Sequence, residues 1–253
     1  MKNLHKLFYK DYYNGVTFKL NGANKVVTSG NLIDIVKEGK SNVNPQLYEL
    51  GGLDSLESII FEVQYPGLVT GVGIQHNVGV KEEFMLGMHF NYTYGHPIVY
   101  GSSVKGVLKY YFKECYEGKD SDDLINDIFE GKLYKTDTFK SIYDRDLFFD
   151  AIICEANADN NVIDSDAITP HGGPKHTNKF AEPTPIPFIK IASGVKLAFR
   201  FRLVDTEDVN GKIVFSKDCK RKLFIKILET FGVGAKTNVG YGQLKKVSVN
   251  VIK

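Results

Sequence analysis

Alternating apolar and polar residues predict three β-strands in this chain of 253 residues, and a short apolar run predicts a fourth. The clearest pattern covers residues 195–204, where Lys196, Arg200 and Arg202 stand between apolar neighbours. A strand of this kind has one buried face and one basic face. The other predicted strands cover residues 59–65, 148–153 and 244–252, and in the first of these Ile59, Phe61, Val63 and Tyr65 share one face.

Two further stretches repeat their apolar residues with the spacing of an α-helix. One helix is predicted over residues 103–115 and the other over residues 218–231. Placed among the strands, they give the order βαββαβ. This order matches the ferredoxin-like, RRM-type fold of the α+β class, in which a four-stranded sheet carries two helices on one face.

Long segments interrupt this predicted core. Residues 67–95 contain many glycines and show no helical period, which favours a long β-hairpin or an extended flap over core structure. A second insertion is rich in proline and is predicted to be loop. We therefore predict a domain at residues 56–253 with insertions at about 66–96 and 154–190, preceded by a segment of uncertain structure at residues 1–55.

The most informative local composition lies at residues 231–244, where four glycines surround Lys236, Thr237 and Tyr241. Glycine permits positive φ and leaves no Cβ in the way, so backbone N–H groups of such a loop can turn toward a phosphate. Lys236 adds positive charge, and Tyr241 offers a flat ring on which a base could stack. The alternative is a turn whose glycines let a strand pack closely against the preceding helix. The order helix, loop, strand excludes a nucleotide-binding P-loop, which runs from a strand into a helix.

The first predicted helix also begins with residues suited to an anion. With Ser102 as the N-cap, Lys105 falls in the first turn, where its positive charge opposes the helix dipole. A bound anion would reverse that effect. Lys105, Lys109 and Lys113 repeat on one face at intervals of four residues, so a polyanion could run along the helix. An ordinary solvated lysine face is the alternative.

The formal net charge of +2 conceals two segments of opposite charge. Residues 114–166 hold fifteen acidic and five basic residues, whereas residues 211–246 hold nine basic and two acidic residues. The basic segment would attract a polyanion. We interpret the acidic segment as a solvated, partly mobile insertion, and a docking surface for a basic neighbour is the alternative.

Other compositional signals bound the function. The three cysteines show neither a disulfide framework nor the spacing of a zinc site, which favours a reducing compartment. No stretch has the length and apolar character of a signal peptide or a membrane span, so we expect a cytoplasmic protein without a membrane partner. His171 and His176 lie in a loop near acidic residues, but their spacing fits no metal site, and no metal or cofactor is predicted.

Three segments together carry a resemblance to a known family. They are Gly101-Ser102-Ser103-Val104-Lys105-Gly106-Val107-Leu108, Asp166-Ala167-Ile168-Thr169-Pro170-His171 and the glycine-rich residues 232–242. In these segments the chain resembles the RAMP superfamily of CRISPR proteins and is most similar to the sixth-subunit family of the type III-B, or Cmr, effector complex. The resemblance covers roughly residues 55–252.

The resemblance implies an RNA-binding backbone subunit that works in antiviral defence. Such a subunit holds the CRISPR guide RNA near its 3′ end, helps to position target RNA and assembles with other Cmr-type RAMP subunits. A flap such as the one predicted at residues 67–95 would separate guide from target. Carried over to this chain, the RNA-binding residues would be Gly101, Ser102, Ser103, Lys105, Lys109, His171, Gly234, Lys236, Thr237 and Tyr241.

The same resemblance raises the question of catalysis, because some RAMP relatives cleave RNA with a histidine and a neighbouring subunit cleaves it with an aspartate after its first strand. Here residues 66–80 hold no acidic residue, and His76 is the titratable candidate among them. A lone loop histidine establishes neither the protonation state nor the reach that acid–base catalysis requires. We therefore expect no catalytic residues. The alternatives are a histidine-dependent, metal-independent endoribonuclease that processes CRISPR RNA, and a ferredoxin-like protein with a structural or small-molecule-binding role.

Overall fold

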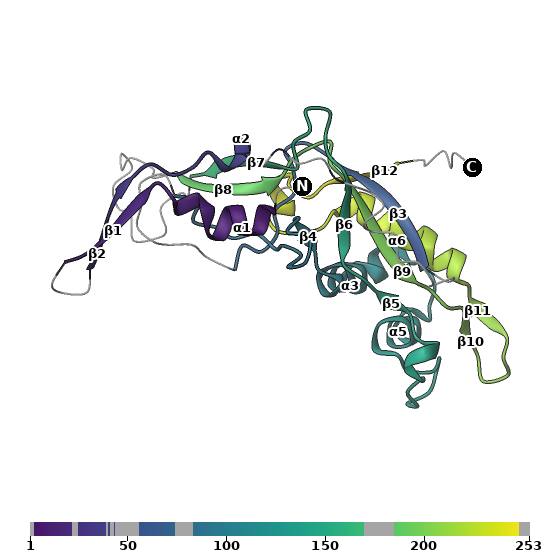
Figure 1. Cartoon of the computed structure of the whole chain (residues 1–253). Helices are drawn as coiled ribbons and strands as arrows, with labels where there is room; N and C mark the ends of the chain where they lie inside the picture. The colour runs from purple at the N-terminus through teal and green to yellow at the C-terminus, as the bar shows by residue number, and fades with distance from the viewer. Residues whose placement is uncertain are drawn as a thin grey trace, which may run out of the picture.

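The computed structural model describes residues 3–21, 25–38, 40, 43, 56–73, 83–169 and 185–247, which form a mixed α+β fold (Figure 1). The helices are α1 (Leu4–Tyr9), η1 (Asp11–Tyr13), α2 (Ile35–Glu38), α3 (Gly101–Tyr110), α4 (Phe112–Cys115), α5 (Ser121–Ile125), η3 (Asn126–Glu130), η4 (Ile142–Asp144), α6 (Lys217–Phe231) and η5 (Thr237–Val239). The strands are β1 (Val16–Asn21), β2 (Lys25–Gly30), β3 (Leu56–Val63), β4 (Ile98–Val99), β5 (Leu147–Phe148), β6 (Ala151–Glu155), β7 (Ile163–Ile168), β8 (Ile186–Ile191), β9 (Lys196–Arg202), β10 (Thr206–Glu207), β11 (Ile213–Phe215) and β12 (Leu244–Lys246).

The central sheet contains all four strands predicted from the sequence. Its order is β12-β3-β9-β6-β4, every neighbouring pair is antiparallel, and β5 also pairs with β9. The strand predicted at residues 148–153 is divided into β5 and β6. It is interrupted at Phe149 and Asp150, where the Asp150 carboxylate accepts a hydrogen bond from the first N–H of α3. The strand predicted at 59–65 ends at Val63, so Tyr65 lies outside it.

The two faces of the sheet pack against different partners. Side chains at alternate positions of β3 and β9, such as Phe61 and Phe199, join Leu108 of α3 and Phe224 of α6 in the main hydrophobic core. The rings of Phe61 and Phe199 pack edge to face, with their centroids 5.2 Å apart. The opposite face carries a smaller buried cluster formed by Ile98, Ile152 and Ala198. Among the described helices, none has the length and apolar character needed to cross a membrane.

The N-terminal segment contributes to the same main core. Leu4, Leu7 and Phe8 of α1 are buried in it, together with Tyr12 of η1. The hydroxyl of Tyr12 accepts a hydrogen bond from the N–H of Phe84, 3.1 Å away. After η1, strands β1 and β2 pair as an antiparallel ribbon that extends to one end of the molecule, opposite β10 and β11 (Figure 1).

The described parts of residues 67–95 pack onto the rest of the molecule, and the flap predicted for this segment stays a prediction. Leu68, Val69 and Met88 are fully or almost fully buried, and the described residues between 64 and 97 form no long hairpin, only a short antiparallel pairing of Phe90 with Pro97. Single bridges instead fasten this segment to its surroundings, as between Leu68 and Ile191. Gly67 and Gly71 allow close packing of the backbone, because a Cβ at either position would lie 2.6 Å from a neighbouring backbone atom. Residues 74–82 lie outside the described part of the chain.

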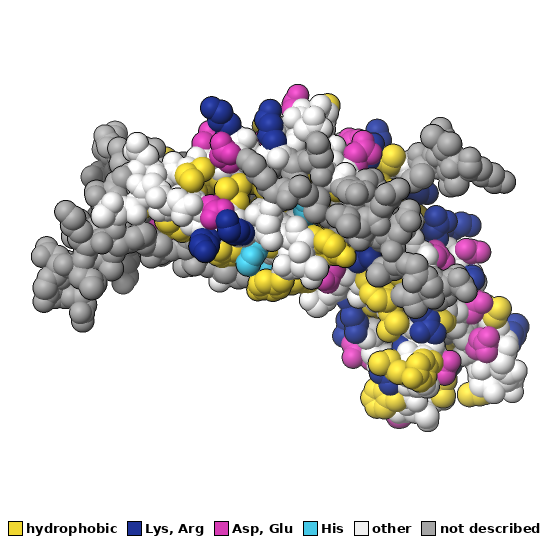
Figure 2. Space-filling view, in the orientation of Figure 1, with side chains coloured by type: hydrophobic (Ala, Val, Ile, Leu, Met, Phe, Trp, Pro, Cys, Tyr) yellow, Lys and Arg dark blue, Asp and Glu magenta, His cyan; other side chains and the backbone are white. Residues whose placement is uncertain are grey.

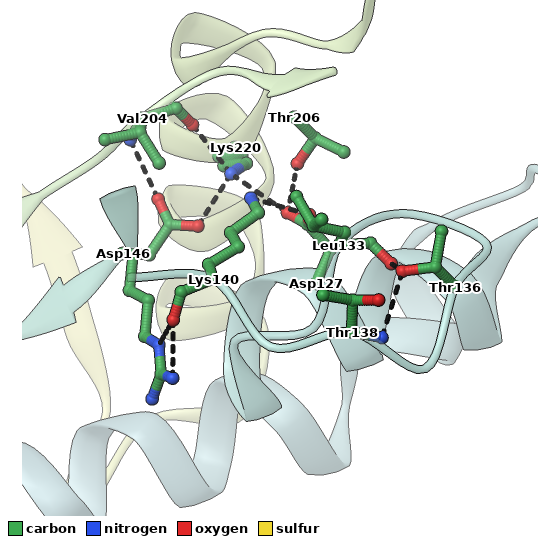
Figure 3. A network of polar contacts seen from close by, with 10 residues as sticks. Asp127, Leu133, Thr136, Thr138, Lys140, Asp146, Val204, Thr206 and Lys220 are labelled. Atoms are coloured by element: carbon green, nitrogen blue, oxygen red, sulfur yellow. Dashed lines mark hydrogen bonds and ion pairs between the residues drawn. The ribbon is translucent and has the colours of Figure 1, made fainter. Parts of the chain in front are cut away.

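The acidic segment is only partly the solvated insertion that its composition suggested, because two of its carboxylates lie in the core. Asp146 accepts a hydrogen bond from the Lys220 ammonium at 2.6 Å, and Asp127 pairs with Lys140 at 2.6 Å (Figure 3). Lys220 comes from α6, so this network joins the acidic segment to the second long helix. The side chains of Lys220, Asp127 and Asp146 are all 0% exposed.

Backbone groups complete the network. The Lys220 ammonium also donates to the carbonyl of Val204 at 2.7 Å, and the N–H of Val204 donates to Asp146 at 2.9 Å. Thr206 donates its hydroxyl to Asp127 at 2.6 Å. Burial raises the pKa of Asp146 and lowers the pKa of Lys220, so each charge depends on its partner. Removing one partner would leave an uncompensated charge in the core.

We expect Asp146→Ala to destabilise the protein by about 3–5 kcal/mol, because it leaves the buried Lys220 ammonium without its hydrogen-bonded carboxylate, and Asp127 at 3.9 Å is more distant. Replacing both partners in Asp146→Leu/Lys220→Met should cost less than the single change. Urea denaturation of the full chain, followed by circular dichroism, measures both. As the control, Asp137→Ala removes a carboxylate from an exposed ion pair and should leave the unfolding midpoint unchanged. A single variant as stable as the control would contradict the proposed role of the network.

Candidate nucleic-acid interface

The start of α3 is capped by a residue distant in sequence. The N–H of Gly101 donates to the carboxylate of Asp150 at 2.8 Å, and the helix begins at Gly101 with Tyr100 as the N-cap residue. The prediction that Ser102 is the N-cap is therefore wrong. A Cβ at position 101 would lie 2.4 Å from the carbonyl oxygen of Phe148, so only glycine fits beside β5. Ser102 is exposed and Ser103 half-buried in the first turn.

Two of the three lysines on the shared face of α3 and α4 form ion pairs within the chain, so this face is not a continuous row of unpaired positive charges. Lys109 pairs with Glu130 at 2.5 Å, and Lys113 pairs with Asp122 at 2.6 Å. The hydrogen bond from Lys109 is the main reason why the pKa of Glu130 lies below its usual range. Figure 2 shows positive and negative side chains interspersed on the lobe that carries α5. Binding of RNA by Lys109 stays a prediction, and it would require displacement of Glu130. Lys105 is half-buried and forms no ion pair with any described residue.

The glycine loop at residues 232–242 follows α6 and precedes β12, which confirms the predicted order of helix, loop and strand. Two of its glycines are required by close backbone contacts. Gly234 has φ +97°, and a Cβ there would lie 2.4 Å from the carbonyl oxygen of Val69. Gly242 has φ +74°, and a Cβ there would lie 2.0 Å from the carbonyl oxygen of Val233. Close packing, the alternative weighed for this loop, therefore accounts for these two positions.

The loop is fastened to the segment that follows β3. The N–H of Ala235 donates to Val69 at 2.8 Å, and the N–H of Gly242 donates to Gly67 at 2.8 Å. Between these two points, the carbonyl of Lys236 accepts the N–H groups of Val239 and Tyr241. Lys236 itself adopts the left-handed conformation, with φ +62°. The N–H groups of Lys236 and Thr237 have no acceptor among the described residues, so they are available to an anion.

Tyr241 fixes the other side of the loop. Its hydroxyl donates to the Asp166 carboxylate at 2.7 Å, and the Lys190 ammonium donates to the same carboxylate at 2.7 Å. Burial would raise the pKa of Asp166, but the hydrogen bonds from Lys190 and Tyr241 hold that pKa below its usual range. Burial and the bond to Asp166 raise the pKa of Tyr241 to about 12. The Tyr241 side chain is only 8% exposed and packs against Phe188, so its ring offers almost no surface for a base.

The start of α3 and the glycine loop meet at one hollow. Its volume is about 260 Å³, and Ser103 and Val107 of α3 line one side of it. Gly234 and Ala235 of the loop, residues 70–73, His89 and Val99 complete the lining. Of the predicted RNA-binding residues, the structure therefore brings Ser103 and Gly234 to the same hollow, with Ser102 and Lys236 close to them in sequence. Thr237, the next residue after Lys236, is half-buried. His171 lies outside the described residues, as do His76 and His176.

Two residues near the hollow gave no signal in the sequence. Asp150 caps α3 from a different element, and only the fold reveals this contact. His89 lines the hollow and stacks on Tyr100, with the ring centroids 4.2 Å apart. Burial lowers the pKa of His89, although Asp150 opposes the shift, so the neutral imidazole is favoured. No described group of His, Cys, Asp or Glu residues forms a cluster that could hold a metal ion.

Comparisons with known proteins identify the family to which this chain belongs. The sequence model of the RAMP superfamily matches residues 60–245. The chain is 25% identical over 183 residues to the CRISPR system CMR subunit Cmr6 of Saccharolobus solfataricus, and the match covers 72% of this chain. It covers 56% of that relative, so the chain spans little more than half of the relative's length.

Of two solved structures that match this chain, one supports a similar fold. One is a chain in the cryo-EM structure of the Type III-B Cmr-beta bound to cognate target RNA, with a TM-score of 0.54 and 22% identity. That match covers 76% of this chain and 58% of the other. The crystal structure of Cmr6 from Pyrococcus furiosus matches with a TM-score of 0.40 and 21% identity, over 76% of this chain and 98% of the other.

We expect Tyr241→Phe to destabilise the protein by about 1.5 kcal/mol at pH 7, because it removes a hydrogen bond to a charged carboxylate. The pKa of Asp166 is lower in the folded protein than the ordinary value of about 3.9. The stabilisation is therefore present above that ordinary value and is lost as the pH falls through the lower, folded pKa. Urea denaturation at a series of pH values measures the difference between the two proteins. Tyr92→Phe, at an exposed ring, is the control. A difference that persists unchanged into strong acid would contradict the role of the Asp166 carboxylate.

Proposed function

Because this chain belongs to the RAMP superfamily, we propose that it is a non-catalytic, RNA-binding backbone subunit of a type III-B CRISPR effector complex. In this role it holds the CRISPR guide RNA near its 3′ end and helps to position target RNA in antiviral defence. Its partners are the guide RNA, the target RNA and other Cmr-type RAMP subunits. The similarity to the Saccharolobus Cmr6 subunit supports this proposal, as does the similar fold of a chain in the Cmr-beta complex that binds cognate target RNA.

One observation carries the proposal, namely the meeting of the α3 start and the glycine loop at the same hollow. Ser103 and Gly234 line it, and Lys236 stands at the next turn of the loop. Hydroxyl, backbone N–H and ammonium groups are the donors that proteins use to hold phosphate oxygens. A single strand whose backbone passes the hollow would contact these donors in turn. Lys105 and Thr237 would add contacts on either side.

The fold proposal is the ferredoxin-like, RRM-type core at residues 56–253. The order β12-β3-β9-β6 supports it, because in that topology the fourth and third strands flank the first and the second strand lies at the edge. Further support comes from α3 and α6, which pack on one face of the sheet. The insertion proposed at about 66–96 then contributes part of the wall around the hollow, and the insertion proposed at about 154–190 lies outside the core strands.

The absence of catalysis is part of the proposal. His89 is the one described histidine that lines the hollow, and its ring is stacked on Tyr100 without a carboxylate bonded to it. An acid–base nuclease needs a correctly protonated group within hydrogen-bond reach of the reacting proton. The His89 ring has no hydrogen-bond partner among the described residues that would set its protonation state, so we rank a histidine-dependent endoribonuclease second. His89 is the residue that such an enzyme would use.

Changing Lys105 and Lys236 together to Ala should lower both the affinity for single-stranded RNA and its dependence on salt. Each contacted phosphate of a single strand contributes about −0.7 to the slope of log affinity against log salt, so losing two contacts should reduce the slope by about 1.4. Fluorescence anisotropy with a labelled oligoadenylate over a range of salt concentrations measures it. The control is Lys119→Ala/Lys212→Ala, which removes the same charge at exposed positions near α5 and β11. Equal slopes for the two double variants would reject the proposed RNA-binding site.

The proposal also predicts that the purified chain releases no product from labelled single-stranded RNA under single-turnover conditions, with or without divalent metal. His89→Ala should then leave cleavage by an assembled complex intact, because no proton transfer depends on that ring. A nuclease that used His89 would instead lose about 10²–10⁴-fold in rate while still binding RNA. Product that forms with the wild type and disappears with His89→Ala would replace the proposal with the second candidate.

A further inference from the structure

Tyr65 is the most exposed of the large hydrophobic side chains in the described residues, with 86% of its surface accessible. The alternation of its strand placed it on the same face as Phe61 and Val63. That placement is wrong because β3 ends at Val63 and the following turn carries Tyr65 away from the core. No described aromatic ring lies against the Tyr65 ring.

The backbone beneath Tyr65 is held on both sides. The N–H of Gln64 donates to the carbonyl of Gln243 at 2.9 Å, and the N–H of Gly67 donates back to Gln64 at 2.9 Å. The carbonyl of Gly67 in turn accepts the N–H of Gly242 at 2.8 Å. Tyr65 therefore sits at the tip of a turn that is fastened to the end of the glycine loop. An exposed ring on a fixed backbone can bind with little further loss of backbone freedom.

The position of this turn relative to the charges of the loop is also fixed. A Cβ at Gly240 would lie 3.8 Å from Cδ of Pro66, so the turn containing Tyr65 lies close beside the glycine loop at that point. Gly240 belongs to the tight turn that Lys236 begins, since the N–H of Tyr241 donates to the carbonyl of Lys236. An exposed flat ring and a lysine with no described ion pair thus stand on adjoining turns.

A single exposed tyrosine is ordinary on a protein surface and carries no argument by itself. What distinguishes Tyr65 is its place beside the proposed phosphate contacts, and the burial of the other candidate ring. Tyr241 is 8% exposed and its hydroxyl is bound to Asp166, whereas both faces of Tyr65 are open. Proteins that bind single strands combine cationic contacts to the backbone with aromatic rings on which bases stack.

On these observations we propose that Tyr65 stacks on an unpaired base of the RNA whose phosphates pass Lys236. The inference rests on the proposed RNA-binding function and adds to it the residue that contacts a base. Tyr241 then serves as the support of the loop rather than as its stacking surface. Because every base has a flat face, stacking of this kind tolerates different sequences.

The test measures the affinity of the full chain for two labelled strands, an oligoadenylate and a matched ribose-phosphate strand without bases. Tyr65→Ala should weaken binding to the oligoadenylate by about 5- to 100-fold, the effect of losing one stacked base. It should leave the salt slope and the affinity for the strand without bases unchanged, because no phosphate contact is lost. Tyr65→Trp should retain the affinity. A 2-aminopurine base in the strand should lose fluorescence on binding to the wild type and to Tyr65→Trp, but not to Tyr65→Ala.

Tyr143→Ala is the matched control, because Tyr143 is 74% exposed and lies at the other end of β9. Arg202, at that end of β9, donates a hydrogen bond to the carbonyl of Tyr143. Lys196, at the opposite end of β9, pairs with Glu62 of β3, three residues before Tyr65. The six steps between Lys196 and Arg202 span about 20 Å of strand. This control should bind both strands as the wild type does.

The outcomes separate the inference from the function on which it rests. If the wild type shows no salt-dependent binding to either strand, both the proposed function and the stacking inference fail. If the wild type binds with the expected salt slope but Tyr65→Ala binds the oligoadenylate equally well, only the stacking inference fails. The same conclusion follows if Tyr65→Ala loses affinity equally for both strands, or if it disrupts assembly with protein partners while RNA binding stays intact.

Discussion

The carboxylate of Asp166 accepts hydrogen bonds from both Lys190 and Tyr241, and through them it joins three segments that are far apart in the sequence. Asp166 lies in β7, Lys190 lies in β8 and Tyr241 lies in the glycine loop. The backbone bond between Gly242 and Gly67 attaches the same loop to the end of β3. The geometry of the hollow, the position of Lys236 and the exposure of Tyr65 all depend on a loop held at these points.

A second set of charges determines how the lobe around α5 is attached to the sheet and to α6. Lys220 and Asp146 are fully buried, and each compensates the charge of the other. The cost of burying these ions is offset only when the partners are in place, so the lobe has one position in which the core charges are balanced. The central sheet and α6 therefore form a firm base for the loop that follows Phe231.

The spacing of apolar residues along the chain predicted the helices and strands, because each depends mainly on residues that are close in sequence. The strands β3 and β9 and the helix α6 were visible because burial on one face leaves a period of two or of 3.6 residues in the sequence. Contacts between distant segments left no such trace. Ser102 looked like an N-cap, but Asp150 provides the cap from another element. The lysines of α3 looked free, but Glu130 pairs with Lys109. Tyr241 was expected to be open to a base but is buried, whereas Tyr65 was expected on the buried face of its strand but is exposed. Each ring lies in or next to a turn, so the period of the strand does not decide where it points.

The ion pairs of Lys109 with Glu130 and of Lys113 with Asp122 have one more consequence. Each carboxylate is tethered to the same chain, so it competes for its lysine at an effective concentration set by the fold and not by the buffer. An RNA strand that extended along α3 toward α4 would have to displace these internal competitors one by one. The footprint of such a strand on this helix would therefore be bounded by the protein's own acidic residues rather than by the length of the helix.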